Sequence, residues 1–148
     1  MEMVVFSGIQ ASGKSTLFRQ RFVETHLRIN LDMLRTRHRE RLLVDACLRA
    51  KQPFVVENTN LTPVERARYL EPARAARFRM VGYRFQIDLE TALQRNARRG
   101  GHPPVPDQAV RAAQRQRVPP TWAEGFDALF DVWSEAGNFR IVEVAHAE

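Results

Sequence analysis

Residues 8–15 read GIQASGKS: a glycine, four further residues, and then Gly13, Lys14 and Ser15. The apolar run MVVF at residues 3–6 precedes this stretch, and the helix-compatible sequence TLFRQRFVE follows it. A Walker A pattern in this context forms a loop whose backbone amides cradle phosphates, whose lysine reaches the β- and γ-phosphates and whose serine hydroxyl ligates Mg²⁺. We therefore predict a nucleoside triphosphate site, with Ser15 as its metal ligand. The loop residues assigned to the nucleotide are Gly8, Ala11, Ser12, Gly13, Lys14, Ser15 and Thr16.

The use of lysine and arginine in this chain is uneven. There are 21 arginines but only two lysines, Lys14 and Lys51, and one of the two lies in the loop. A compact ammonium and a planar guanidinium are not interchangeable, so the lysine at position 14 supports the motif.

The formal net charge of +6 favours an anionic partner such as nucleic acid. Genome composition and the needs of a phosphate site explain the same excess equally well.

Length and composition restrict the protein class. A chain of 148 residues has the size of one domain, so we treat residues 1–148 as a single domain. Its hydrophobic content of 44% and charged content of 27% are ordinary for a soluble globular protein. No apolar run approaches the roughly 20 residues of a membrane helix, and the single cysteine, Cys47, excludes an internal disulfide. We expect a cytoplasmic protein without a membrane partner, in which Cys47 is a buried spectator.

Short β-rich runs alternate with longer helical patterns, which predicts an α/β fold with a mostly parallel five-stranded sheet flanked by helices. Strand-like runs lie at residues 3–6, 27–31, 54–57 and 79–87, with short ones near 128–132 and 139–144. Helices are expected to about residue 25 after the loop and over 33–50, 63–76, 89–98 and 107–116. In the second of these, Leu42, Leu43, Ala46 and Leu48 are expected to face inward. Thr62 and Asp88 are the expected N-caps of the third and fourth.

Asp32 follows the second strand-like run, at the sheet edge where open α/β folds bind their ligands. A carboxylate there can accept the proton of a hydroxyl that attacks the γ-phosphate, or it can hold a water of Mg²⁺. The alternative is that Asp32 only caps the next helix. Arg35 follows one turn later on the same expected helix face, where it can bind a phosphate beside the attacking hydroxyl. Its alternative is an ordinary solvated arginine.

Six strings occur in an order and spacing that resemble the 5'-kinase domain of the polynucleotide kinase/phosphatase family. They are GIQASGKST, INLDML, VVENTN, ERARYLEPARAA, VP at 105–106 and AEGF at 123–126, and the resemblance extends over residues 4–132. It implies a P-loop kinase fold and ATP-dependent transfer of the γ-phosphate to a 5'-hydroxyl of DNA or RNA, with Mg²⁺. DNA or RNA 5' ends would then be the partners.

The resemblance also implies roles for single residues. Lys14 and Ser15 would contact the phosphates and Mg²⁺, and Asp32 would be the general base. Arg35 matches an arginine that engages the acceptor's phosphate in the phage-type enzyme and that the animal enzyme lacks. The arginines of RNARRGG would form a small arginine-rich lid over the ATP phosphates, at about residues 95–106. The candidates for this contact are Arg95, Arg98 and Arg99.

Other positions stay open between two roles. Glu57 replaces an aspartate of the relatives, which keeps the charge and extends its reach by one carbon. Asn58 and Asn60 either line the acceptor site or form a turn after the strand. Trp122 and Phe126 either border the adenine or pack their loop against the last helix.

Two other functions are compatible with the same residues. One is a P-loop kinase for a small-molecule hydroxyl that uses the same Asp32. The other is a nucleotide-binding module or slow ATPase that works by changing conformation. A nucleic-acid kinase should lose affinity for its acceptor steeply as salt rises, whereas a small-molecule kinase should not.

Overall fold

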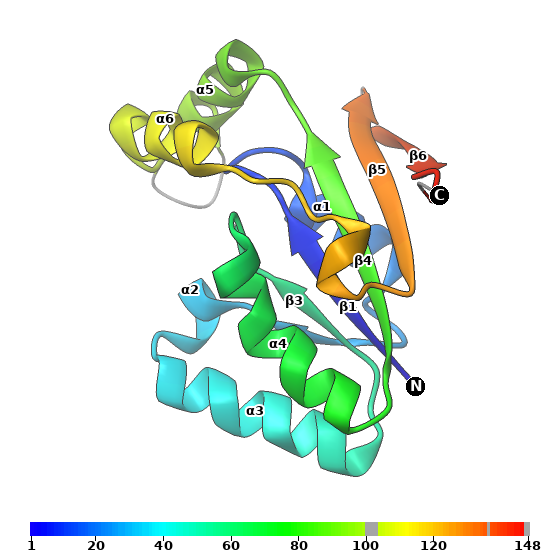
Figure 1. Ribbon diagram of the computed structural model, residues 1–148. Coiled ribbons are helices and arrows are strands. Elements are labelled where there is room, and N and C mark those ends of the chain that lie inside the picture. Colours follow the sequence, from blue (N-terminus) through cyan, green and yellow to red (C-terminus); the bar gives the residue numbers. More distant parts are fainter. Residues whose placement is uncertain (100–103, 136, 147–148) are drawn as a thin grey trace.

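A six-stranded sheet with the order β2-β3-β1-β4-β5-β6 forms the centre of the computed structural model, which describes residues 1–99, 104–135 and 137–146 (Figure 1). Its strands are β1 (Glu2–Ser7), β2 (Leu27–Ile29), β3 (Phe54–Glu57), β4 (Arg79–Gln86), β5 (Ala128–Glu135) and β6 (Asn138–Glu143). The first five are parallel, and β6 pairs antiparallel with β5. The sheet is mostly parallel as predicted. It has six strands and not the expected five, because the strand-like run near 139–144 also joins it, as an antiparallel partner of β5.

Helices cover both faces of this sheet. They are α1 (Lys14–Arg21), α2 (Leu31–Leu34), α3 (Arg37–Ala50), α4 (Pro63–Ala75), α5 (Leu89–Ala97) and α6 (Asp107–Gln116), with a 3₁₀ turn, η1 (Trp122–Glu124). Thr62 and Asp88 cap α4 and α5 as predicted, because their side chains accept hydrogen bonds from the backbone amides three residues on. Among the described residues, no helix combines the length and the apolar content that crossing a membrane requires.

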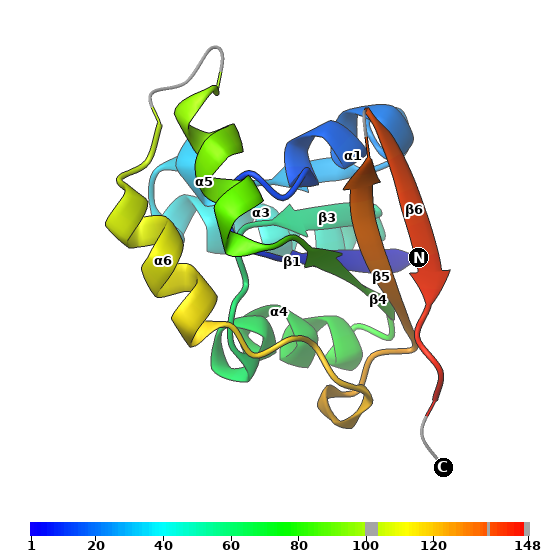
Figure 2. The ribbon, with the colours of Figure 1, turned by 90° about the horizontal axis from the view of Figure 1, so that it is seen from above.

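The side chains of β1 alternate between two hydrophobic cores. Met3 and Val5 pack with residues of α3 and α4, whereas Val4 and Phe6 pack with Leu17 and its neighbours on α1. This follows from the two-residue period of a strand, which sends successive side chains to opposite faces. Figure 2 shows α1 and α4 on opposite sides of the sheet. Strand β1 is therefore buried on both faces, and its carboxyl end delivers residues 8–15 to the middle of the sheet edge.

Helices α5 and α6 lie beyond the carboxyl ends of the strands (Figure 1). They share a small core in which Ala92 and Val110 pack with Ile9 of the loop. Asn96 is 1% exposed, and its amide donates to the carbonyl of Val105 at 2.7 Å and accepts from the Val105 amide at 3.2 Å. This pair joins the end of α5 to the chain before α6. Residues 100–103 of the expected lid lie outside the described residues.

The expected single helix over 33–50 is wrong at its beginning. Asn30 caps α2 by accepting from the Met33 amide at 2.9 Å, and Thr36 caps α3 by accepting from the Arg39 amide at 3.1 Å. Arg35 lies between the two helices with a φ of 75°. Two good capping residues thus begin two helices where the apolar pattern indicated one. The cap at Asn30 also ends β2 at Ile29, and α1 ends at residue 21, earlier than expected.

The predicted buried face of the helix now assigned to α3 is also wrong. Leu42, Leu43 and Ala46, which were expected to face inward, are exposed. The buried residues of α3 are Glu40, Val44, Cys47 and Leu48. Their spacing is that of a helical stripe, but it begins with a charged residue, so the apolar pattern alone pointed to the wrong side. Cys47 is buried as predicted.

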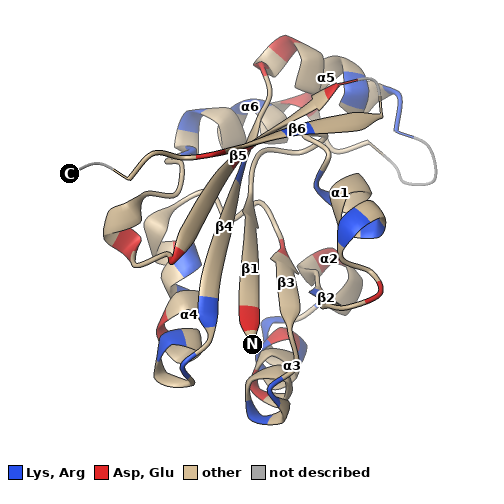
Figure 3. Ribbon diagram, turned by 90° about the vertical axis from the view of Figure 1, so that its right-hand side faces the viewer, with Lys and Arg blue, Asp and Glu red and all other residues tan. Residues whose placement is uncertain are grey.

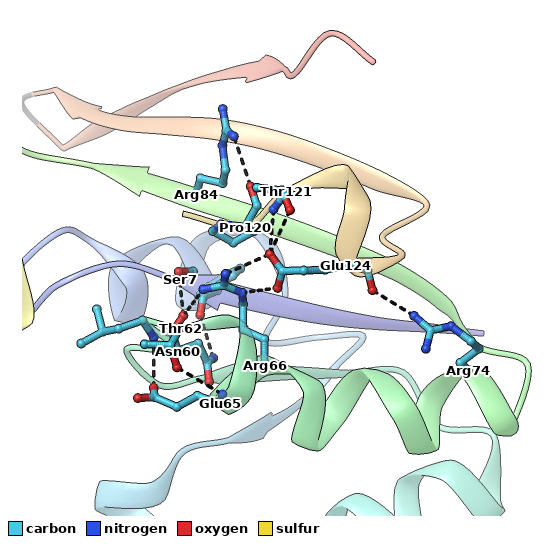
Figure 4. Close-up of polar contacts among 12 residues, drawn as sticks. Ser7, Asn60, Thr62, Glu65, Arg66, Arg74, Arg84, Pro120, Thr121 and Glu124 are labelled. Carbon is cyan, nitrogen blue, oxygen red and sulfur yellow. Dashed lines mark hydrogen bonds and ion pairs between the residues drawn. The ribbon is translucent and has the colours of Figure 1, made fainter. Parts of the chain in front are cut away.

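A buried ion pair connects η1 to α4. Arg66 is completely buried, and its guanidinium donates to both carboxylate oxygens of Glu124 at 2.7 and 2.9 Å and to the Asn60 carbonyl at 2.8 Å. Figure 4 shows Arg66 between these partners, with the Ser7 hydroxyl also directed at Asn60. The Asn60 amide donates to the carbonyl of Phe6 at 2.8 Å. Asn60 therefore forms the turn after β3, the structural one of its two expected roles.

Candidate active site

Residues 8–15 form a tight loop between β1 and α1. A Cβ on Gly8 would lie 2.7 Å from the Cβ of Phe85, so only glycine fits there. Gly13 has a φ of 103°, and a Cβ on it would lie 3.0 Å from the Phe139 ring. Gly13 is also the N-cap of α1 and makes no side-chain capping bond, so the first amides of the helix remain available for an anion. The residues assigned to the nucleotide, Gly8, Ala11, Ser12, Gly13, Lys14, Ser15 and Thr16, all lie in this loop and the first turn of α1.

Lys14 folds back over the loop. Its ammonium donates to the carbonyls of Gly8 at 2.6 Å and Ile9 at 2.8 Å. Burial of the ammonium lowers the pKa of Lys14 from 10.5 to about 8. The charge of Glu57 opposes this shift, Arg99 adds to it, and Asp32 opposes it. Two backbone carbonyls thus hold the Lys14 ammonium over the loop.

Three buried polar atoms without a hydrogen-bond partner in the described structure lie in or beside the loop. Among the described residues, the Ser12 hydroxyl, the Gln10 side-chain carbonyl and the Nε of Arg28 are buried and make no hydrogen bond. Burying such groups is costly, so unpartnered atoms in a cluster indicate a polar ligand. The loop amides and Lys14 are the donors that phosphates require. The residues present therefore fit a nucleotide.

A carboxylate and a guanidinium lie beside the predicted metal ligand. Glu57 ends β3 and is 3% exposed, and its carboxylate accepts from the Arg28 Nη2 at 3.0 and 3.2 Å. Asn30 donates to the same carboxylate at 2.7 Å. The Arg28 Nη2 also donates to the Ser15 hydroxyl at 3.4 Å. In the described part of the chain, His, Cys, Asp and Glu side chains form no metal-binding group of their own. A divalent cation here would therefore rely on Ser15, on nucleotide phosphates and on water.

Asp32 and Arg35 lie at the two ends of the short helix α2. Asp32 is exposed in the first turn, and Asn30 makes the capping bond, so the alternative that Asp32 caps this helix is wrong. Arg35 is exposed, and it ends α2 rather than continuing a helix face from Asp32. Its φ of 75° is unusual for a residue with a side chain. Asp32 and Arg35 are still close in the chain, on a segment at the carboxyl edge of the sheet.

A buried polar network fixes the start of α2. Asn58 accepts from the Leu31 amide at 2.8 Å and donates to Glu40 at 3.1 Å and to the Tyr69 hydroxyl at 3.2 Å. The Tyr69 hydroxyl donates to Glu40 at 2.8 Å, and Arg37 donates to Glu40 at 2.9 Å. Burial and the nearby Glu40 raise the pKa of Tyr69. The network thus connects α3, α4 and the end of β3 to the residue before Asp32.

The three candidate lid arginines have different surroundings. The positive charge of Arg99 contributes to the lowered pKa of Lys14. Arg95 donates to the Ser134 carbonyl at 3.3 Å and lines a cavity of about 520 Å³ at the ends of β4, α5 and β5. Arg98 is exposed at the end of α5. Of the two aromatic candidates, Phe126 is buried in the core formed with α3 and α4, and Trp122 packs against the same core. Both therefore pack their loop, but against this core and not against the last helix, α6.

Sequence reasoning missed Arg28, Glu40 and Tyr69. For Arg28, the sequence did show a charged residue inside the short strand at 27–31. It also showed an acidic residue, Glu57, at the end of another strand. For Glu40 the signal was the helical spacing to Val44 and Leu48. Neither signal identifies a partner, because the contacts join segments far apart in the chain.

The sequence pattern of a family described as an AAA domain matches residues 3–120, which is most of the chain. The chain belongs to this AAA domain family. A bifunctional polynucleotide phosphatase/kinase of Schizosaccharomyces pombe is 28% identical over 135 residues, which cover 88% of the chain and 33% of that protein. The chain therefore spans about a third of the length of this relative.

Two solved structures have the same fold as this AAA domain. Kti12 of Chaetomium thermophilum, in complex with ADP-AlF₃, has a TM-score of 0.71 at 18% identity and covers 91% of the chain and 92% of its own. A gluconokinase of Sinorhizobium meliloti has a TM-score of 0.61 at 18% identity, over 88% of the chain and 81% of its own. These likenesses concern the fold. The protein thus has the nucleotide-binding P-loop fold of kinases and related ATPases, as its sequence predicted.

Proposed function

We propose that this AAA domain is an ATP-dependent phosphotransferase that moves the γ-phosphate to a 5'-hydroxyl of DNA or RNA. The observation that carries the proposal is the carboxylate of Asp32, which is exposed in the first turn of α2 at the carboxyl edge of the sheet and is not used as the helix cap. A base near the phosphate-binding lysine is what a hydroxyl acceptor needs. Because a carboxylate there can serve a hydroxyl acceptor or the attacking water of an ATPase, the choice of acceptor rests on the sequence likeness. The sequence likeness to a polynucleotide phosphatase/kinase over 88% of the chain supports the 5'-hydroxyl as the acceptor.

Each residue has a role in the proposed reaction. The loop amides and Lys14 neutralise the charge on the phosphates, and Asp32 takes the proton of the attacking hydroxyl. The bond from the acceptor oxygen to the γ-phosphorus forms as the bond to the bridging oxygen breaks, and ADP leaves. Mg²⁺ held by Ser15 would add positive charge to the β- and γ-phosphates. Arg95, Arg98 and Arg99 remain the three lid arginines that we propose for the phosphates of ATP.

The positive charge of the chain is compatible with a polynucleotide acceptor. Figure 3 shows Lys and Arg spread over α1, α3, α4, α5 and α6 rather than gathered on a single helix. Arg35 is the residue we assign to the acceptor phosphate, since it is exposed and close in the chain to Asp32. A small-molecule hydroxyl is the second candidate acceptor, which the fold likeness to a gluconokinase favours.

Transfer of label from γ-labelled ATP tests the proposal. The acceptors are DNA and RNA oligonucleotides with a 5'-hydroxyl, the same oligonucleotides with a 5'-phosphate, and a panel of small molecules that includes gluconate. We expect label on the 5'-hydroxyl oligonucleotides alone, with an apparent affinity that falls as salt rises. Label on a small molecule with none on any oligonucleotide would establish the second candidate instead. ATP hydrolysis without any labelled acceptor would favour a conformational ATPase.

Asp32→Asn tests the base. Transfer is expected to fall by about 10² to 10⁴-fold, the usual contribution of a general base, while the dissociation constant of ADP stays the same. Calorimetry measures the ADP affinity of both proteins. Asp45→Asn is the matched control, because Asp45 is an exposed aspartate on α3 that pairs only with Arg49 in the described structure. A variant at position 32 with normal transfer would show that Asp32 is not the base.

A further inference from the structure

We propose that the guanidinium of Arg28 occupies the place of the divalent cation between Ser15 and Glu57. It leaves this place when the metal binds with the nucleotide. The inference rests on the proposed binding of ATP and Mg²⁺ at the loop, and it is independent of the acceptor. It concerns a residue of β2 that neither the loop motif nor the resemblance assigns.

The contacts of one nitrogen atom define this place. The Arg28 Nη2 lies 3.0 and 3.2 Å from the two carboxylate oxygens of Glu57 and 3.4 Å from the Ser15 hydroxyl. These contacts join α1, β2 and β3, which the strand order brings together at one sheet edge. A guanidinium therefore connects the predicted metal ligand to the nearest buried carboxylate.

A hydrated Mg²⁺ would use the same two oxygen groups. Mg²⁺ prefers oxygen ligands and keeps several waters, so a hydroxyl that ligates it and a carboxylate that accepts from its waters form a suitable pair. A guanidinium and a divalent cation repel each other at such distances. Arg28 and the metal therefore compete for Ser15 and Glu57.

The surroundings of Arg28 allow it to leave. Its side chain is 33% exposed, and its Nε is buried without a hydrogen-bond partner among the described residues. In this position the guanidinium thus makes only part of its possible hydrogen bonds, and part of the side chain is already in contact with solvent. Asn30 donates to Glu57 at 2.7 Å and keeps the carboxylate oriented after Arg28 has moved.

Burial of Glu57 explains why a positive charge accompanies its carboxylate. A carboxylate that is 3% exposed is costly unless a positive charge accompanies it. Arg28 supplies this charge, and the metal replaces it. Metal entry is then coupled to the release of Arg28, so the arginine raises the metal concentration that the site needs.

Binding of Mn²⁺ to the ADP-saturated protein, measured by electron paramagnetic resonance, tests the competition without any acceptor. Arg28→Gln is expected to bind Mn²⁺ up to about fivefold more tightly than the wild type, the upper end of what a partly exposed ion pair contributes to an equilibrium. ADP binding without metal should stay the same. Arg28→Lys keeps the charge and should stay within about twofold of the wild type. In Glu57→Gln protein, the further change Arg28→Gln should bring no gain.

Arg79→Gln is the matched control for these variants. Arg79 is an arginine of the same sheet that also pairs with a glutamate, Glu2 at 3.4 Å, and it lies at the amino end of β4. Its replacement removes the same charge and should leave Mn²⁺ binding unchanged. An equal gain in this control would overturn the proposal, because net charge would then explain the effect.

A second measurement needs no variant. The side-chain Nε–H signal of Arg28, followed by nuclear magnetic resonance in the wild type, should change when Mg²⁺ is added to the ADP complex. An unchanged signal, or Mn²⁺ binding to Arg28→Gln that is equal or weaker, would overturn the proposal while leaving the proposed function intact. Failure of the wild type to bind ADP with metal at all would instead overturn the proposed function, and this inference with it.

Discussion

Replacing Lys14 by methionine is expected to remove a rise in stability that the nucleotide-free protein shows between pH 7 and pH 10. Burial lowers the pKa of Lys14 in the folded protein to about 8, whereas the unfolded chain keeps the ordinary value of 10.5. Between these values the unfolded chain holds more protons than the folded protein. The free energy of unfolding therefore increases with pH in this range, because deprotonation removes the unfavourable burial of the ammonium.

The size of the effect follows from the two values. At about 1.4 kcal/mol per pH unit, the interval from about 8 to 10.5 corresponds to roughly 3 kcal/mol for complete titration and to about 2.5 kcal/mol between pH 7 and pH 10. Methionine has a similar length and no charge. It also loses the bonds to the Gly8 and Ile9 carbonyls. The comparison therefore concerns the change with pH and not the stability at one pH.

Urea unfolding at pH 7 and pH 10, followed by circular dichroism, measures this change in the protein without nucleotide. Other groups that titrate in this range contribute equally to both proteins and cancel. Lys51→Met is the matched control, since Lys51 is the other lysine of the chain and is exposed. We expect this control to keep the rise. A rise in Lys14→Met as large as in the wild type would refute the assignment of a buried, easily deprotonated ammonium at the loop.

Three further substitutions test the surroundings of the site. Glu40→Gln should lower the free energy of unfolding by about 1–3 kcal/mol, because the buried carboxylate holds Asn58. It should also slow phosphate transfer without changing ADP affinity, and normal transfer would contradict this positioning role. Glu124→Gln should cost about 3–5 kcal/mol in urea unfolding, because it leaves the charge of the buried Arg66 uncompensated, and an unchanged midpoint would contradict the pair. Asn96→Ala should cost about 1–3 kcal/mol and lower kcat at saturating ATP, since the amide joins α5 to the chain before α6; unchanged kcat would argue against a lid there.

Features that depend on neighbouring residues could be predicted. The loop at residues 8–15 needs only a strand before it, a helix after it and glycines where side chains do not fit. The caps at Thr62 and Asp88 depend on bonds that reach three residues along the chain. The alternation of strands and helices was sufficient to predict a mostly parallel sheet.

Predictions that depended on distant segments succeeded less well. One helix was expected over 33–50, because the apolar pattern continues through this range. The caps at Asn30 and Thr36 begin two separate helices instead. The buried stripe of α3 begins at Glu40, whose partners come from α4 and from the end of β3. A carboxylate with such partners can be buried, and no pattern within the helix reveals them.

The sequence by itself determined that this protein has a phosphate-binding loop with Lys14 at its centre, because the motif is local and each position in it has one chemical role. It also placed Asp32 after the second strand. Only the tertiary structure decided that Arg28 stands between Ser15 and Glu57. The physical reason is that these contacts join α1, β2 and β3, and their meeting depends on the strand order of the whole sheet.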